Sequence, residues 1–234
     1  MSSIRCQNLT KTFEQGGVKI KGLDKVNLEI KKGEFLCLSG PSGSGKTTLL
    51  NALGGLLTPD SGKLEINGKD IIKLNKDQLA NIRLHDIGFI FQSYNLIPVL
   101  SAQENVEFIM QAQGVNAVER SQRAQQILKE VGLQGLEKRL SSELSGGQQQ
   151  RVAVARAIVS KPALILADEP TANLDSASAL SLMKLISTLN QKHNITVVLA
   201  THDNRIMNIA RRQVHMQDGQ IVSDLPTENL SDIA

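Results

Sequence analysis

Apolar and polar residues alternate from Leu23 to Ile30, and this period of two is typical of a strand with one buried face. Lys32-Gly33 follows and leads into Glu34–Ser39, so the pattern predicts a hairpin formed by these two segments. A further strand at Leu64–Ile66 ends at Asn67-Gly68, a pair that favours a tight turn. The first part of the chain is therefore predicted to be rich in β-structure.

From Ser101 to Gly135 the pattern changes from strand to helix. Ser101 and Asn116 are each followed three residues later by a glutamate, which is the spacing of helix N-caps. Gly114 and Gly132 stand where two helices would end. Because this stretch shows no alternation, we expect a small helical lobe inserted between strands.

Two continuous apolar runs, Ala163–Ala167 and Ile195–Ala200, lie on either side of the helical stretch Ala177–Lys192. Apolar strands joined by a helix are typical of a parallel sheet that is covered on both faces. The order of elements predicts an α/β core.

The composition fits one folded domain with two lobes, because 41% of the 234 residues are hydrophobic, 21% are charged, and no linker divides the chain. The net charge of +3 is small and the basic pairs are scattered, so we expect no nucleic acid partner. The longest apolar runs are far shorter than the roughly 20 residues that span a bilayer. Residues 1–10 carry no secretory leader, so we expect a cytosolic protein in which Cys6 and Cys37 fill core positions.

A glycine-rich run after the apolar segment Phe35–Leu38 fits the pattern G-x-x-x-x-G-K-[ST] and opens a helix-like stretch. In such a loop backbone amides point at phosphate oxygens, Lys46 adds a positive charge, and Thr47 can offer its hydroxyl to magnesium. The predicted phosphate-binding residues are Gly40, Pro41, Ser42, Gly43, Ser44, Gly45, Lys46, Thr47 and Thr48. A dinucleotide-binding loop fits less well, because Thr48 occupies the position of its third glycine. The run therefore predicts a nucleoside triphosphate site.

Two carboxylates, Asp168 and Glu169, follow directly after the strand at 163–167. Ligands of α/β sheets collect at this edge, so Asp168 is predicted to hold magnesium and Glu169 to accept a proton from the attacking water. His202 has a similar place after the next apolar strand, where an imidazole can donate to the γ-phosphate. For His202 alone, a surface histidine that caps a helix is an equally good interpretation.

Leu144–Gln148 is a second glycine-rich helix start. Ser145 and Gln148 have the spacing of a capping box, and Gly146 and Gly147 leave backbone amides open to an anion. By spacing alone, an anion site and an ordinary glycine-rich helix start are equally well supported. One nucleotide hardly needs two such sites from the same chain.

Taken in order, these segments resemble the nucleotide-binding subunit of an ATP-binding cassette (ABC) transporter over nearly the whole chain. The matching segments are the Walker A run at 40–47, Gln92 after Ile87–Phe91, the LSGGQ segment at 144–148, the Walker B strand ending at Asp168-Glu169, the D-loop at 173–175 and the switch histidine, His202. The resemblance implies a P-loop NTPase core with a parallel sheet, an N-terminal antiparallel β lobe and an inserted helical lobe. It implies a single ABC ATPase domain over residues 1–234, with a RecA-like core and β lobe at 1–92 and 160–234 and a helical lobe at 93–159.

The resemblance also implies ATP and Mg²⁺ as cofactors, and a head-to-tail homodimer in which each ATP lies between one subunit's Walker A run and the other's LSGGQ segment. It implies Phe13 as the aromatic residue that stacks on adenine, where the family often has tyrosine; a core phenylalanine is the alternative. The implied catalytic residues are Lys46, Gln92, Glu169 and His202, the implied magnesium ligands are Thr47, Gln92 and Asp168, and the implied nucleotide contacts across the dimer are Ser145, Gly146, Gly147, Gln148 and Asp175.

Within the family, Ile87–Glu107 looks most like the lipoprotein-release and macrolide-efflux group, whose ATPases work with permeases of the bacterial envelope. This likeness implies a peripheral location on the cytoplasmic face of the bacterial inner membrane. It also implies that integral membrane permease subunits contact the segment from Gln92 to Leu100, here named the docking loop. The apolar residues of that loop are predicted to form the contact, and internal packing is the alternative for them: Leu96, Ile97, Val99 and Leu100.

Other functions fit part of the sequence. An ATP-driven signalling clamp of the cell-division type, which moves no substrate, would share every motif. A chromosome or repair ABC ATPase would need long coiled coils or zinc-binding cysteines, and the chain has two cysteines and no heptad run. A GTPase is disfavoured because Asn75-Lys76-Asp77-Gln78 has glutamine where the guanine-binding carboxylate is needed. The transported substrate is not predicted, because its choice belongs to the permease.

Overall fold

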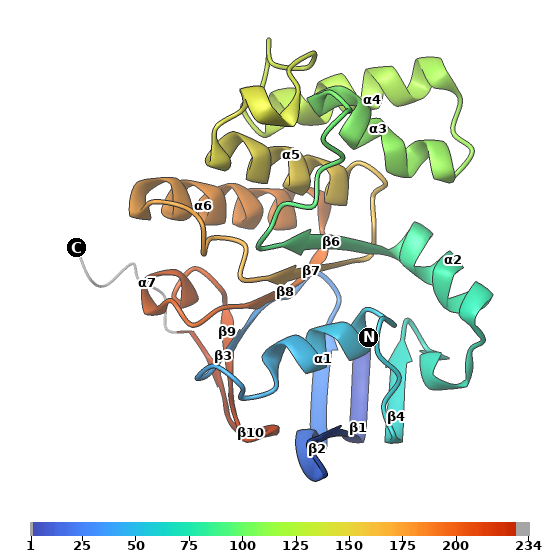
Figure 1. The fold of residues 1–234 in the computed structure, drawn as a ribbon, viewed down its shortest axis with the longest axis vertical. Coiled ribbons are helices and arrows are strands. Elements are labelled where there is room, and N and C mark those ends of the chain that lie inside the picture. Colours follow the sequence, from blue (N-terminus) through green and yellow to red (C-terminus); the bar gives the residue numbers. More distant parts are fainter. Residues whose placement is uncertain (1, 228–234) are drawn as a thin grey trace. The chain divides into compact units, whose positions relative to one another are not determined.

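The computed structural model describes residues 2–227, and its contacts divide the chain into two units (Figure 1). The first unit joins residues 2–80 with 196–227, and the second is Asn81–Ile195. The first unit therefore combines the two ends of the chain, and the second is one continuous insertion. The lobe boundaries proposed at residues 93 and 159 stay a prediction.

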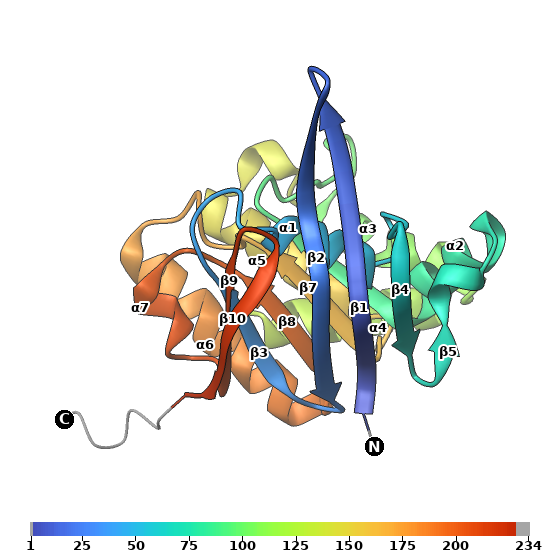
Figure 2. The same cartoon turned by 90° about the horizontal axis from the view of Figure 1, so that it is seen from below.

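An antiparallel sheet in the first unit has the strand order β2-β1-β4-β5. Its strands are β1 (Ser2–Gln15), β2 (Val18–Lys31), β4 (Ser61–Ile66) and β5 (Lys69–Asp70). Figure 2 shows β1 and β2 as a long hairpin with β4 on the other side of β1. Gly16 and Gly17 make the hairpin turn at φ values of 58° and 79°, a region that favours glycine. Asn67 and Gly68 form the predicted tight turn, which joins β4 to β5.

The hairpin predicted between Leu23–Ile30 and Glu34–Ser39 is wrong. β2 pairs with β1, whereas β3 (Phe35–Ser39) pairs in parallel with β8 (Thr196–Ala200) and β9 (Arg212–Gln217). The burial of the two strands gives the reason: β2 alternates along its second half, while all five residues of β3 are buried. A strand buried on both faces belongs in the middle of a covered sheet, so the turn at 32–33 passes the chain from one sheet to another.

Among the described residues of the first unit, the remaining elements are one more strand of this second sheet and three helical segments. β10 (Gln220–Pro226) pairs antiparallel with β9, so it lies at the outer end of the order β10-β9-β3-β8. The helical segments are α1 (Lys46–Leu53), the 3₁₀ turn Ile71–Lys73 and α7 (Asn204–Met207). Helix α2 (Lys76–Asp86) runs across the sequence boundary at residue 80.

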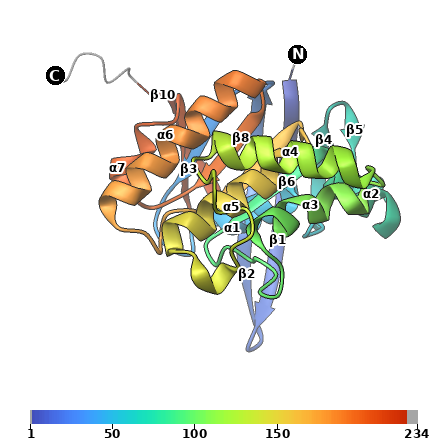
Figure 3. The same cartoon turned by 90° about the horizontal axis from the view of Figure 1, so that it is seen from above.

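The second unit has two parallel strands and four further helices. The strands are β6 (Ile87–Phe91) and β7 (Leu164–Asp168), and the helical elements are α3 (Ala102–Ala112), α4 (Ala117–Glu130), α5 (Gly146–Ile158), α6 (Ser176–His193) and the 3₁₀ turn Ser141–Glu143. Helices α3, α4 and α5 pack against one another, as Figure 3 shows. Gly88 permits close packing of β6, because a methyl group there would lie 2.3 Å from the carbonyl oxygen of Ala157. The predicted helical lobe is thus present as three packed helices.

The predicted helix ends are confirmed. Ser101 caps α3 in a complete capping box with Glu104, and the Asn116 side chain accepts a hydrogen bond from the amide of Glu119 at the start of α4. Cys6 and Cys37 are buried free thiols, as predicted. Among the described residues, no helix is both long and apolar enough to cross a membrane.

Candidate functional site

The phosphate loop, Gly40–Thr47, follows β3 and includes the first two residues of α1 within the first unit. Gly40 and Gly45 adopt φ values of 138° and 102°, where side chains are strained. A methyl group on Gly40 would lie 2.1 Å from the carbonyl oxygen of Met216, and one on Gly45 would lie 2.4 Å from that of Gly22. Neighbouring backbone therefore packs against the loop so closely that both positions require glycine.

The Lys46 side chain lies inside this loop and binds its backbone. This side chain is buried, and Nζ donates hydrogen bonds to the carbonyl oxygens of Gly40 at 2.8 Å and Pro41 at 2.9 Å. The hydroxyl oxygen of Ser44 is also buried and has no hydrogen-bond partner among residues 2–227. An ammonium group, an unpaired buried hydroxyl and the N-terminus of α1 together fit the oxygens of a phosphate chain.

Phe13 lies on β1 in the same unit and is 40% exposed. The edge of its ring packs on Gly22, where a methyl group would lie 2.5 Å from Phe13 Cε2. Lys11 Nζ lies 5.9 Å from the ring centroid, and Asp60 holds it by a 2.7 Å ion pair. Since Gly22 contacts both Phe13 and Gly45, the backbone fixes the ring relative to the phosphate loop. A half-exposed aromatic face in this place suits the predicted stacking on adenine.

We expect Phe13→Ala to weaken ATP binding about 5- to 100-fold, because stacking on an aromatic ring is worth about 1–3 kcal/mol per base. Calorimetric titration with ATP measures this change. Phe13→Tyr should restore the affinity, and Phe108→Ala, which truncates a 48% exposed phenylalanine on α3, is the matched control. Equal affinities in Phe13→Ala and the parent chain would contradict the assignment.

His202 follows β8, the parallel neighbour of the strand that leads into the phosphate loop. The amide of Thr201 donates to the carbonyl oxygen of Leu38 at 3.1 Å, which ties the ends of the two strands together. The His202 side chain is exposed, and Asp203 caps the N-terminus of α7. A hydrogen bond from Arg205 holds the pKa of the Asp203 carboxyl below its usual range. The histidine thus lies at the same sheet edge as the phosphate loop, and its contact with a γ-phosphate stays a prediction.

Gln92, Asp168 and Glu169 lie together at the carboxyl edge of β6 and β7 in the second unit. Phe91 and Asp168 are register partners, so Gln92 and Glu169 are the next residues on two adjacent strands. The Asn173 side chain donates to the carbonyl oxygen of Gln92 at 3.0 Å, and Glu169 has a left-handed φ of 45°. This strained backbone turns the chain away from the strand directly after the two carboxylates.

The predicted magnesium ligands provide one hydroxyl, one amide and one carboxylate oxygen: Thr47, Gln92 and Asp168. Mg²⁺ prefers such oxygen ligands, and it usually takes only one or two carboxylates together with phosphate oxygens. No cluster of three or more His, Cys, Asp or Glu residues able to hold a metal lies in the described part of the chain. By residue type, these oxygen donors suit Mg²⁺ that binds together with a nucleotide, and their meeting at one ion stays a prediction.

The LSGGQ segment, Leu144–Gln148, forms the start of α5. Ser145 and Gln148 make the predicted capping box: the Gln148 amide donates to Ser145 Oγ at 3.3 Å, and Gln148 Oε1 accepts from the Ser145 amide at 2.9 Å. Asp175 caps α6, and hydrogen bonds from the Ser178 side chain and amide lower the pKa of its carboxyl. The segment is thus a capped helix N-terminus with two partly exposed glycines.

The sequence analysis missed Gln150, which is fully buried on α5. Its Nε2 donates to the carbonyl oxygens of Pro170 at 2.7 Å and Phe91 at 3.4 Å. Gln150 therefore connects two segments to α5. These are the end of β6, just before Gln92, and the turn that follows Glu169. The glutamine run at 148–150 has no period that distinguishes this buried member from its partly exposed neighbours, so the sequence carried no signal for it.

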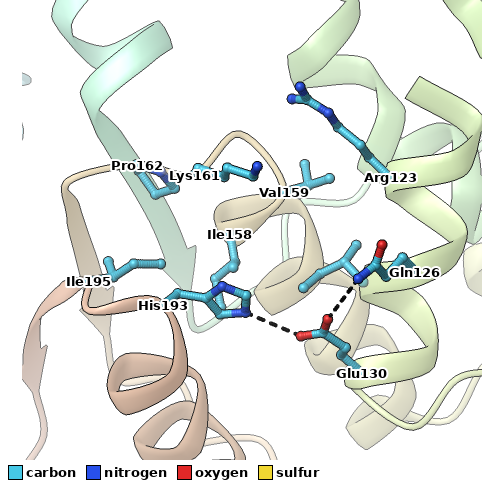
Figure 4. Close-up of a pocket in the computed structure, with 10 residues that line it drawn as sticks. Arg123, Gln126, Glu130, Ile158, Val159, Lys161, Pro162, His193 and Ile195 are labelled. Carbon is cyan, nitrogen blue, oxygen red and sulfur yellow. Dashed lines mark hydrogen bonds and ion pairs between the residues drawn. The ribbon is translucent and has the colours of Figure 1, made fainter. Parts of the chain in front are cut away.

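A cavity of about 350 Å³ in the second unit lies at the C-terminal ends of α4, α5 and α6 (Figure 4). Burial opposes ionisation of Glu130 there, but hydrogen bonds from Lys192 and His193 outweigh it and lower the pKa of this carboxyl. None of the predicted nucleotide-binding residues lines the cavity. This cavity is therefore separate from the predicted nucleotide site.

The model of the ABC transporter family matches residues 23–172. The macrolide export ATP-binding/permease protein MacB of Marinobacter nauticus is 42% identical over 225 residues, which cover 96% of this chain and 35% of that protein. The ABC transporter ATP-binding protein YtrE of Bacillus subtilis is 44% identical over 206 residues, which cover 88% of this chain and 89% of YtrE. The chain thus spans about a third of the length of MacB and most of the length of YtrE.

Solved structures show the same similarity. A dimeric post-hydrolysis state of the ATP-binding cassette MJ0796 bound to ADP and Pi has a TM-score of 0.89 and 40% identity, and the match covers 97% of this chain and 99% of that one. A dimeric structure of MJ0796 described as a bacterial ABC transporter cassette gives the same TM-score at 41% identity. The fold predicted from the motifs is therefore confirmed.

Proposed function

The chain belongs to the ABC transporter family and is an ATP-binding ATPase, and we propose that it drives a partner membrane permease. The observation that carries the proposal is the pairing in one chain of a phosphate loop and the capped start of α5. Each presents backbone amides at the start of a helix, an arrangement that suits an anion. Two copies arranged head to tail would use both on each ATP, and the similar cassette MJ0796 is dimeric in both solved structures.

In this proposal each chain contributes two sets of residues. Lys46 and the loop amides bind the phosphates, Phe13 stacks on the base, and Glu169 accepts a proton from the attacking water. Gln92 and His202 act near the γ-phosphate, while Ser145–Gln148 and Asp175 contact the nucleotide of the second copy. Magnesium held by Thr47, Gln92 and Asp168 would neutralise charge on the transferring phosphoryl group.

The docking loop is the proposed permease contact. Val99 is 80% exposed, whereas Leu96, Ile97 and Leu100 are only partly exposed, so Val99 is the most exposed of the four apolar side chains. The buried Asn105 side chain donates to the carbonyl oxygens of Ile97, Leu100 and Ser101 and accepts from the Ile97 amide, which shapes this loop. Val99 is therefore the side chain that we propose to insert into the partner.

The likeness to the macrolide export protein MacB supports an export or envelope-type permease as the partner. We propose that the chain itself is a peripheral subunit at the cytoplasmic face of the bacterial inner membrane. The substrate would be chosen by that permease. An ATP-driven signalling clamp differs only in what the membrane partner does. Reconstituted vesicles distinguish the two functions, because a pump exports a substrate and a clamp activates a partner without export.

We expect a thiol-specific crosslinker on Val99→Cys to yield an adduct with a membrane protein when the chain is expressed in its own bacterium. Burial raises the pKa of the Cys6 thiol to about 12, and Cys37 is also buried, so the native cysteines should not react. Val118→Cys, which replaces a 68% exposed valine on α4, is the matched control. Equal labelling of membrane proteins by the two variants would contradict the proposed contact.

A further inference from the structure

Tyr94 lies at a junction of three segments within Asn81–Ile195. A methyl group on Gly146 would come within 2.9 Å of Tyr94 Oη, so the hydroxyl end of the ring packs against the Gly146 backbone. Leu174 Cδ2 would lie 3.9 Å from the same methyl group. The docking loop, the LSGGQ segment and the D-loop segment therefore meet at one glycine.

Arg156 holds the backbone of the docking loop at this point. Tyr94 and Asn95 both adopt left-handed φ values, 56° and 50°, and such residues cost about 1–3 kcal/mol each unless neighbours stabilise them. Arg156 Nη2 donates to the carbonyl oxygen of Tyr94 at 2.9 Å, and Nη1 donates to that of Asn95 at 2.5 Å. A guanidinium group on two successive carbonyls fixes the direction in which the Tyr94 side chain leaves the backbone.

Arg156 and Gly146 belong to the same helix, α5, and this helix contacts the docking loop twice. Its first residue touches the tip of the Tyr94 ring, and its last turn binds the backbone of Tyr94 and Asn95. A loop held at two points of one rigid helix cannot shift at Tyr94 without moving the ring relative to Gly146. The ring of Tyr94 thus connects the conformation of the docking loop to the N-terminus of α5.

We propose that Tyr94 is a positioning residue that sets the Gly146 backbone against the ATP of the second copy. This proposal rests on the proposed function, because it assumes that the LSGGQ segment faces a nucleotide. A permease that contacts the docking loop would then change the hydrolysis rate through the ring of Tyr94. Misplacement of a catalytic contact by about 1 Å can cost up to about a hundredfold in rate, so a small shift of this ring is sufficient.

The contact can be tested directly, because the chain has one tyrosine and no tryptophan. Biosynthetic labelling with fluorotyrosine gives a single fluorine NMR resonance, which reports on Tyr94 alone. We expect Gly146→Ala to displace the ring and shift this resonance. Gly147→Ala is the matched control, because its methyl group would lie 3.8 Å from the nearest atom, Ser178 Oγ. An unchanged resonance in Gly146→Ala, or equal shifts in both variants, would overturn the proposal.

The effect on hydrolysis separates positioning from a merely structural role. We expect Tyr94→Ala to lower kcat about tenfold while its Kd for ATP stays parental, because the phosphate loop and Phe13 belong to the other unit. Tyr94→Phe keeps the ring but loses the hydroxyl that lies against Gly146, so its kcat should fall between those of Tyr94→Ala and the parent. The exposed control Val118→Ala should stay within about twofold of the parent. A parental kcat in Tyr94→Ala, or a loss of ATP affinity equal to the loss of kcat, would overturn the role.

Failure of the proposed function gives a different result. In that case MgATP leaves the Glu169→Gln chain monomeric in light scattering. If only the Tyr94 proposal fails, the dimer forms normally, and the fluorotyrosine resonance of Gly146→Ala matches that of the parent.

Discussion

Glu169→Gln should lower kcat for ATP hydrolysis about 10²- to 10⁴-fold, because removal of a general base costs this much. The glutamine side chain has the same size as the glutamate side chain. It keeps its place at the carboxyl edge of β7, directly after Asp168. ATP should still bind, since the phosphate loop is unchanged. The expected product is an ATP-bound dimer that does not turn over, measured by steady-state phosphate release and by light scattering with MgATP.

The matched control is Glu119→Gln, which removes a carboxylate of α4 that pairs with Arg123 at the surface. Surface ion pairs contribute about 0–1 kcal/mol, so this variant should hydrolyse ATP at the parental rate. If Glu169→Gln also hydrolyses ATP at the parental rate, Glu169 is not the base. If it loses activity but stays monomeric with saturating MgATP, the head-to-tail dimer is wrong.

Lys46→Ala should raise the Kd for ATP about 10- to 100-fold, because a hydrogen bond to a charged group is worth about 1.5–3 kcal/mol. Lys46 Nζ donates hydrogen bonds to the loop carbonyl oxygens of Gly40 and Pro41, so the ammonium group lies inside the loop that is predicted to bind phosphate. Calorimetric titration with ATP measures the change.

Lys69→Ala is the control for charge, because Lys69 is an exposed lysine on β5 and belongs to none of the predicted nucleotide contacts. Its affinity for ATP should equal that of the parent. Thermal unfolding of both variants checks that the fold is intact. A parental Kd for Lys46→Ala with a normal unfolding midpoint would exclude the phosphate loop as the ATP site.

The features that local sequence predicted correctly depend on contacts within a few residues. Ser101, Asn116 and Ser145 cap helices because each side chain reaches an amide three residues ahead. The phosphate loop and the Asn67-Gly68 turn need backbone angles that glycine permits, and glycine is visible in a sequence. The order of the motifs along the chain indicated the family, and the family resemblance in turn supplied the candidate site residues.

The pairing of strands was not predictable in the same way. Alternation in Leu23–Ile30 indicates a strand with one buried face, but it does not say which strand lies beside it. The sequence favoured the next segment, 34–39, whereas β2 pairs with the preceding strand β1. Every residue of β3 is buried, and this is why β3 pairs with strands of the covered sheet and not with β2. Its partners, β8 and β9, lie more than 150 residues away in the chain.

The amino-acid sequence by itself determined the helix caps, the glycine turns and the identity of the nucleotide motifs, because these depend on residue type and short spacing. Only the tertiary structure placed Tyr94 against Gly146, Arg156 on the docking loop and Gln150 between the strand ends. These contacts join residues 20 to 62 positions apart in the chain. Side chains so far apart in sequence meet only when packed helices and strands bring them together, and no local pattern records that approach.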